Sequence, residues 1–225
     1  MLCAYSGLAF VALFVAGFWF VAGLVPPPSA SDGAQRIAHF YAANADQLRA
    51  GMLLALIATP LLVPFIVLLS SQLRRSDPRL APLAQVQLVC GAILVVEVLI
   101  CVVLIGTAAF RAGRSPEVTQ ALNDTAFTFL LWAFTAPALE YAAIGIAVLL
   151  DGSERPLFPR WVGYFDLALA LVFAAGGPTL FVKGGAFGWD GALAFWAVLV
   201  GFTLWVLITF SSMLKAIART SPASP

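Results

Sequence analysis

The sequence contains few charged residues. Only 10% of its 225 residues are Asp, Glu, Lys or Arg, whereas 62% are hydrophobic. A soluble domain is usually about a quarter charged and about half apolar, so this chain has more apolar side chains than a water-facing fold can bury. Its formal net charge of +1 provides no basic surface for nucleic acid. We therefore expect the lipid bilayer to be the main partner of the chain, and no nucleic acid to bind.

Histidine and cysteine are also scarce. The chain has one histidine, His39, and three cysteines, Cys3, Cys90 and Cys101. A single histidine excludes the histidine-rich clusters of metal enzymes and leaves no base for a serine or cysteine nucleophile within the apolar runs. Cys90 and Cys101 would lie about 16 Å apart along one helix, too far for a disulfide. We predict no metal site, no cofactor and no conventional hydrolase.

Long apolar runs dominate the rest of the sequence. A backbone in lipid must satisfy its hydrogen bonds internally, so apolar runs of about 18 or more residues predict membrane-spanning helices. The alternation of apolar and polar residues that a β-barrel needs is absent. We predict one all-α domain over residues 1–225, an integral membrane bundle of six transmembrane helices. Its spans are about 5–25, 51–73, 83–110, 124–150, 160–182 and 191–215.

The positions of Lys and Arg predict an orientation. With a cytoplasmic N-terminus, seven of these residues lie inside and five outside, which agrees with the positive-inside rule. We expect a multipass protein of the cell (inner) membrane with both termini cytoplasmic. The first run is long for a signal peptide and no Lys or Arg precedes it, so we expect a retained span. The inner residues are Arg74, Arg75, Arg79, Arg155, Arg160, Lys215 and Arg219.

Polar and proline residues predict features outside the straight spans. Between the first and second spans, Ser31 or Asp32 can cap a short amphipathic helix that we expect to lie along the membrane surface. Pro60 and Pro64 predict a kink in the second span, and Pro116 fits the first position of a helix capped by Ser115. One face of the amphipathic helix comprises Ile37, Phe40, Tyr41, Asn44 and Leu48.

Three acids lie well inside the predicted spans without a Lys or Arg at comparable depth: Glu97, Glu140 and Asp166. An ionised carboxylate in hydrocarbon costs several kcal/mol, so such groups are protonated, hydrated, hydrogen-bonded or bound to a cation. We expect mostly neutral forms. The alternative to a functional role is that each acid only bonds a neighbouring helix and stabilises the bundle.

Glu140 and Asp166 are predicted to lie at similar depth. Glu140 is fourteen residues before the turn near Glu154 and Asp166 is twelve after it, so their depths differ by about 3 Å. Small residues flank both acids at helical spacing and let two helices approach closely. If the hairpin packs directly, the two carboxyls can share a proton or a ligand. The flanking residues are Ala133, Ala136, Ala143 and Ala147, and Gly163, Ala170, Ala174 and Gly177.

The third span adds a polar stripe of Gln87, Cys90, Glu97 and Cys101, and serines end the second and sixth spans on the predicted inner side. We interpret Ser70, Ser71, Ser211 and Ser212 as residues that meet lipid headgroups. The candidate ligand- or proton-binding residues are Gln87, Glu97, Glu140, Tyr141 and Asp166, and the candidate catalytic acids are Glu97, Glu140 and Asp166.

Three functions remain open from the sequence. A non-enzymatic subunit or partner within a membrane complex is favoured by the absence of a motif and of a large soluble part, and implies other membrane subunits or self-association as partners. A small proton- or cation-coupled transporter is indicated by the intramembrane acids and kinked spans. A membrane-embedded enzyme could use one of the acids as a general acid on a lipophilic substrate. Enzymatic activity is the less favoured expectation.

Overall fold

The computed structural model describes residues 1–111, 113–154 and 156–220, without the side chains of Arg219 and Thr220. Arg155, one of the residues used to predict the orientation, lies outside the described residues. Within the described part the chain is helical and contains no strand, and six of its helical stretches are long and apolar enough to cross a membrane. The predicted all-α bundle with six spans is confirmed. The six stretches are Leu2–Val21, Ala45–Ser76, Pro78–Phe110, Pro116–Leu150, Arg160–Leu180 and Gly185–Ala218.

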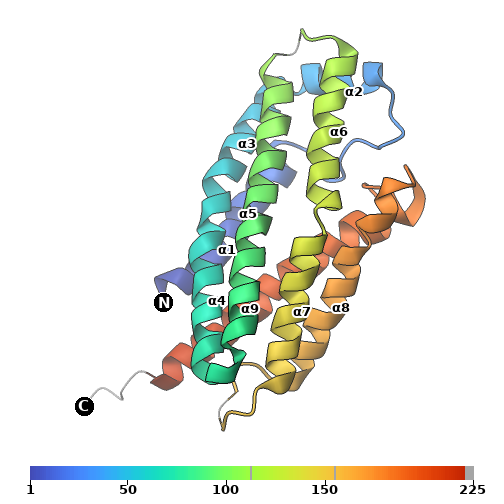
Figure 1. The fold of residues 1–225 in the computed structure, drawn as a ribbon. Coiled ribbons are helices and arrows are strands. Elements are labelled where there is room, and N and C mark those ends of the chain that lie inside the picture. Colours follow the sequence, from blue (N-terminus) through green and yellow to red (C-terminus); the bar gives the residue numbers. More distant parts are fainter. Residues whose placement is uncertain (112, 155, 221–225) are drawn as a thin grey trace.

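The bundle has two ends that we name from Figure 1. Helix α2 and the start of α6 lie at the upper end, and the α4–α5 and α7–α8 turns lie at the lower end, whereas α9 crosses the bundle obliquely. The α-helices are α1 (Leu2–Val15), α2 (Ala34–Ala43), α3 (Ala45–Ala58), α4 (Leu62–Ser76), α5 (Ala81–Phe110), α6 (Pro116–Trp132), α7 (Thr135–Leu150), α8 (Arg160–Ala174) and α9 (Val198–Thr220). The tighter, 3-10 segments are η2 (Thr59–Leu61), η3 (Pro78–Leu80), η4 (Gly177–Leu180) and η5 (Gly185–Phe187). The wide, π-helical segments are η1 (Ala16–Val21) and η6 (Ala192–Ala197).

The second span is interrupted at a predicted position. Helix α3 ends at Ala58, a short 3-10 segment contains Pro60, and α4 begins at Leu62. Proline has no N–H for the helical hydrogen-bond ladder. The Thr59 hydroxyl donates a hydrogen bond of 2.7 Å to the carbonyl of Ala55, one turn earlier in α3. The predicted departure from regular helix at Pro60 is confirmed.

The fourth span has a break that the sequence did not predict. Helix α6 ends at Trp132 and α7 begins at Thr135. Pro137 cannot donate to the carbonyl of Ala133, which instead accepts a 3.3 Å bond from the N–H of Ala136. The helix begins at Pro116, as expected from the sequence, whereas the start of the span itself at about residue 124 stays a prediction. Ser115 is the N-cap residue, but its side chain makes no capping hydrogen bond.

A ten-residue helix, α2, is present between the first two spans. Its N-cap is Gly33 rather than Ser31 or Asp32, and the Asp32 carboxylate instead accepts a bond from the N–H of Ser29. Tyr41 is buried and donates a 3.1 Å hydrogen bond to Oδ1 of Asn123 on α6. Helix α2 is therefore tied to the bundle by its buried face, and its position along a membrane surface stays a prediction.

Helices α7 and α8 pack directly against each other through two glycines. A Cβ atom on Gly145 would lie 2.8 Å from the carbonyl oxygen of Gly163, and one on Gly163 would lie 3.0 Å from the carbonyl oxygen of Gly145. Larger residues at these positions would force the backbones apart. The hairpin therefore packs directly, which is the condition for a site shared by the two acids; Gly163 belongs to the small-residue stripe noted in the sequence, whereas Gly145 does not.

Candidate functional site: a buried polar layer

The side chain of Glu140 on α7 is fully buried and is held by α5. The Gln87 side-chain amide donates a 3.0 Å hydrogen bond to Glu140 Oε1, whereas Glu140 Oε2 has no hydrogen-bond partner among the residues that the structure describes. Gly91, four residues after Gln87, makes room for the carboxyl, because a Cβ atom at this position would lie 2.7 Å from Glu140 Oε1. The amide and the glycine together fix where the carboxyl sits between the two helices.

Asp166 on α8 lies near Glu140. Asp166 is three residues after Gly163, and Glu140 is five residues before Gly145, so in this antiparallel pair both acids lie on the same side of the glycine contact. Their depths differ by about 3 Å. The two carboxyls are near enough to interact electrostatically. Asp166 is fully buried, and neither of its oxygens has a hydrogen-bond partner in the described part of the chain. The similar depth expected from the sequence is present in the fold.

Tyr141 connects these acids to α8 and α9. Its ring centroid lies 4.9 Å from that of Phe173 and 5.2 Å from that of Trp205. Both the Tyr141 hydroxyl and the Trp205 indole N–H are buried, and neither has a hydrogen-bond partner within the described residues. Trp205 was not identified from the sequence. Its apolar neighbours on α9 give no sign that it meets a polar group.

Glu97 is placed differently from the other candidates. It is ten residues after Gln87 on α5, or about 15 Å farther along the helix axis. Its side chain is buried with neither oxygen hydrogen-bonded. It interacts with Glu140 only through space. The structure therefore groups Gln87, Glu140, Tyr141 and Asp166, while Glu97 stands apart.

Eight buried side-chain N or O atoms have no hydrogen-bond partner among the described residues: two on Glu97, and six on Gln87, Glu140, Tyr141, Asp166 and Trp205, which we call the polar layer. Folded proteins pair about 90% or more of their buried polar groups, so these atoms call for an explanation. The salt bridges of the described residues all involve Asp32, Asp46 or Asp77, not these acids. The layer is thus a set of enclosed acids without a cation. The atoms are Gln87 Oε1, both carboxyl oxygens of Glu97, Glu140 Oε2, the Tyr141 hydroxyl, both carboxyl oxygens of Asp166 and Trp205 Nε1.

An apolar cavity of about 160 Å³ lies among α1, α5, α6, α7 and α9. An apolar wall of this kind suits a small apolar molecule. The interrupted helices contribute to its wall, which includes residues at both wide helical segments and at the α6–α7 break. These residues are Phe18 and Phe195 in the two wide segments and Phe134 and Pro137 at or just after the break; Gly176, between α8 and η4, also lines the cavity.

Aromatic rings separate this cavity from the polar layer. Phe173 and Phe202 line the cavity. On their other sides, Phe173 packs against Tyr141 and Phe202 lies 5.9 Å from Trp205 between ring centroids. Neither Glu97, Glu140 nor Asp166 lines the cavity. A molecule in this cavity would therefore contact aromatic carbon rather than a carboxyl group.

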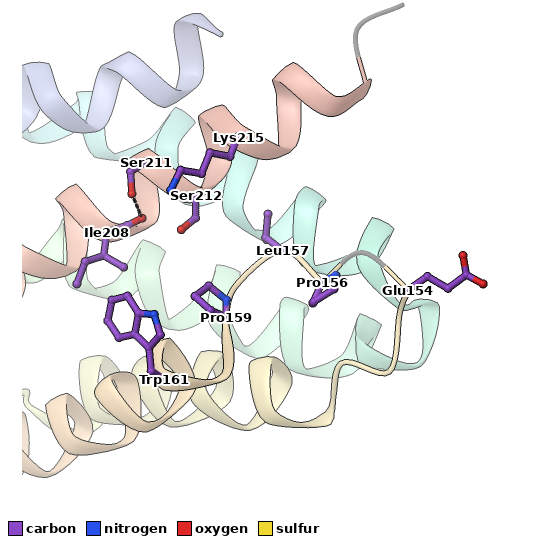
Figure 2. Close-up of a pocket in the computed structure, with 9 residues that line it drawn as sticks. All are labelled: Glu154, Pro156, Leu157, Pro159, Trp161, Ile208, Ser211, Ser212 and Lys215. Atoms are coloured by element: carbon purple, nitrogen blue, oxygen red, sulfur yellow. Dashed lines mark hydrogen bonds between the residues drawn. The ribbon is translucent and has the colours of Figure 1, made fainter.

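The lower end of the bundle contains a second, polar cleft of about 740 Å³ between the start of α8 and the end of α9 (Figure 2). Ser211 and Ser212 line it. Ser70 does not, and its hydroxyl instead donates a 2.8 Å hydrogen bond to the carbonyl of Ala84, which ties α4 to α5. The serines grouped by the sequence thus have different surroundings.

Asp151 at the lower end was not identified as important from the sequence. Its carboxylate accepts hydrogen bonds from the Ser76 hydroxyl and, at 3.0 Å, from the N–H of Ser153. Partial burial acts to raise the pKa of Asp151, but these bonds outweigh it and hold the pKa below its usual range. Asp151 therefore stabilises the contact between the end of α4 and the turn after α7 as an anion.

Comparison with known proteins provides no identity: no family model, curated protein or solved structure matches the chain. Within the described residues no group of three or more His, Cys, Asp or Glu is placed to hold a metal ion. Six apolar helices fit a multipass membrane protein. The buried polar layer and the two cavities are the features on which a function can be based.

Proposed function

We propose that the chain is a small proton-coupled membrane carrier in which Glu140 binds the proton, with Gln87 and Asp166 as its immediate surroundings. The supporting observation is that Glu140 Oε2 and both Asp166 oxygens are enclosed without a partner. An enclosed carboxyl without a cation is stable when it holds a proton. Because the two acids interact, ionisation of one opposes ionisation of the other.

The hydrogen bond from Gln87 gives this site two states. An amide N–H stabilises an ionised acceptor more than a neutral one, so Glu140 releases its proton more readily when Gln87 is in place. Movement of α7 away from α5 would remove the bond and favour the protonated form. The α6–α7 break at Ala133 and Phe134 is the point at which α7 can move relative to α6. Discontinuous spans near a binding site are a recurring feature of carriers.

The cavity suggests the class of solute. Its lining is almost entirely apolar, and the hydroxyl of Thr203, one of its few polar groups, already bonds the Leu199 carbonyl at 2.8 Å. A small lipophilic molecule fits this wall. The aromatic contact from Phe173 to Tyr141 connects a molecule in the cavity to the polar layer.

Proton flux in proteoliposomes tests the proposal. Purified protein is reconstituted with an enclosed pH-sensitive dye, and a potassium diffusion potential drives protons. We expect wild-type flux above that of empty vesicles and at least a tenfold loss in Glu140→Gln. Glu117→Gln is the matched control, since Glu117 is exposed at the start of α6. Wild-type flux no greater than that of empty vesicles, or full flux in a combined Glu140→Gln and Asp166→Asn variant, would contradict the proposal.

A second candidate function is that of a non-enzymatic subunit of a membrane complex. The chain covers its first and sixth spans least, since 28% and 22% of their most apolar windows are buried, against 50% for the third span. These two spans meet, as the Tyr5 and Phe210 rings on α1 and α9 show with centroids 5.3 Å apart. A stoichiometric membrane partner or a dimer in mild-detergent native mass spectrometry would favour this function. A monomer that carries protons would favour the carrier.

General-acid catalysis has less support. None of the three acids lines the cavity that could hold a lipophilic molecule, and Phe173, which does line it, packs against Tyr141 beside Glu140. A general acid must reach the atom that it protonates, at about 3 Å or through one water. The geometry thus favours a carrier or a subunit over an enzyme.

A further inference from the structure

The cleft at the lower end combines one cationic side chain, a hydroxyl group that can still donate a hydrogen bond, and an apolar wall. Lys215, Ser211, Ser212 and Ile208 line it from α9, and Trp161 lines it from the first turn of α8. Figure 2 shows these side chains facing one another across the opening. The cleft shares no lining residue with the proposed proton site.

Ser212 provides the most specific feature of the cleft. Its side chain is only 9% exposed, yet its hydroxyl has no hydrogen-bond partner among the described residues. Figure 2 shows the hydroxyl directed into the opening, on the side of Pro159 and Trp161. The neighbouring Ser211 already donates to the Ile208 carbonyl at 2.8 Å. Ser212 is therefore a nearly buried hydroxyl that faces the cleft with its proton free to donate.

Lys215 provides the charge. None of the ion pairs of the described residues involves it, and Figure 2 shows its side chain lying back along α9 with the amino group near Ser212. Glu154 lies at the rim of the cleft, but its carboxylate points away from Lys215. The inner part of the cleft thus has a net positive charge and a hydroxyl donor, which suits a singly charged phosphate diester.

The wall of the cleft matches the rest of a lipid molecule. The Trp161 side chain is 56% exposed, and Tyr164 one turn later is 62% exposed. Tryptophan and tyrosine are enriched where helices pass from hydrocarbon to headgroups. Helix α8 begins at Arg160 beside the cleft, and the N–H groups of its first turn add a partial positive charge. Trp161 and Ile208 offer an apolar surface for the glycerol and acyl portion.

We propose that this cleft binds an anionic phospholipid, with Lys215 and Ser212 holding the headgroup phosphate and Trp161 and Ile208 covering the first carbons of the acyl chains. A lipid rather than free phosphate is the occupant, because the cleft lies between the ends of two helices that are long and apolar enough to cross a membrane. Basic pockets between such helices are recurrent sites for anionic headgroups. The site does not depend on the proposed carrier function.

Native mass spectrometry of the full chain tests this site. Detergent-purified protein is titrated with phosphatidylglycerol and, separately, with phosphatidylcholine. We expect tighter binding of phosphatidylglycerol, and about a fivefold loss of its affinity in Lys215→Gln, as expected for one basic residue near the headgroups. Lys183→Gln is the matched control, because the chain's other lysine is exposed outside the cleft. We expect the control to bind as the wild type does.

Two further measurements complete the test. Ser212→Ala removes only the hydroxyl and should weaken phosphatidylglycerol binding two- to threefold while the protein keeps its elution volume and melting temperature. Lipid-free protein should show no phosphorus-31 line broadening with millimolar inorganic phosphate. Equal affinity in Lys215→Gln and Lys183→Gln, equal binding of the two lipids, or binding of inorganic phosphate as tight as that of lipid would each overturn the proposal.

Discussion

Gln87 and Glu140, fifty-three positions apart in the sequence, are joined by a 3.0 Å hydrogen bond between α5 and α7. The bond is enclosed, and the second oxygen of Glu140 has no partner. Asp166 adds a second acid within electrostatic range. The charge state of Glu140 is consequently coupled to the contact between α5 and α7, and each of the following experiments changes one part of this arrangement or of the helices that hold it.

Glu140→Gln should be tolerated better than Glu140→Lys. The amide is neutral, as a protonated carboxyl is, whereas an enclosed lysine without an acid partner costs about 3 kcal/mol at the centre of a span. We expect folded Glu140→Gln protein at near wild-type yield and a large loss for Glu140→Lys, measured by size-exclusion chromatography in detergent. Equal losses in the two variants would show that Glu140 is not neutral in the folded protein.

Gly91→Ala should destabilise the bundle by about 1–3 kcal/mol, the usual range for overpacking a core. The added methyl group would lie 2.7 Å from Glu140 Oε1 and 2.8 Å from Cγ2 of Ile66. Thermal unfolding monitored by intrinsic fluorescence would show a lower melting temperature. Gly152→Ala is the control, because a Cβ atom there meets nothing within 4 Å. A melting temperature equal to that of the control would contradict this packing.

Pro137→Ala should close the α6–α7 break. Alanine supplies an N–H that can bond the Ala133 carbonyl, so α6 and α7 can join into one regular helix. We expect slower hydrogen exchange across residues 133–138 and a higher melting temperature. If the carrier proposal holds, proton flux should fall in the same variant, since α7 can no longer move relative to α6. Unchanged exchange across the break would show that Pro137 does not cause it.

Ser76→Ala should lower the stability of the protein at neutral pH, because the Asp151 anion loses a hydrogen bond. The pKa of Asp151 is lowered in the folded chain, so its contribution to stability is present above the unfolded pKa of about 3.9 and is lost as pH falls through the folded pKa. Without the Ser76 hydroxyl this pKa should rise towards its usual value. The difference in melting temperature between wild type and Ser76→Ala should therefore be largest at pH 5–7 and shrink towards pH 3.

The corresponding control for this experiment is Asp46→Asn, since Asp46 pairs with Arg49 at the exposed start of α3. Exposed ion pairs contribute little to stability. Its melting curve should follow that of the wild type from pH 7 to pH 3. A Ser76→Ala difference that stays constant over this range would show that the Ser76 hydroxyl does not act through the charge of Asp151.

The sequence predicted the spans because apolar run length is set directly by membrane thickness. It also placed Glu140 and Asp166 at similar depth, since residue counts from a common turn convert to distance along two helices. The break at Pro137 was missed because proline is tolerated in the first turn of a helix, and the residues before it are apolar like the rest of the run. Pro60, with Pro64 four residues later, gave a clearer signal.

The packing partners of the site could not be predicted in the same way. Gln87 was identified from its place on a polar stripe, but its bond to Glu140 depends on how α5 and α7 are rotated about their axes. Gly91 and Trp205 also belong to the site because of how the helices are rotated, and no sequence pattern indicates either residue. Asp151 lies in a turn, where a lone acid is usually solvated, so its bonds to Ser76 and Ser153 became evident only from the fold.

The glycine contact between α7 and α8 has a mechanical consequence. Because the backbones touch at Gly145 and Gly163, we expect α7 and α8 to move together as a single lever. Its upper attachments are the α6–α7 break and the end of α8 near Gly176, where the structure is not regular α-helix. A tilt of this lever would carry Glu140, Tyr141 and Asp166 together and keep their separations constant. The distance that would change is the one from Glu140 to Gln87.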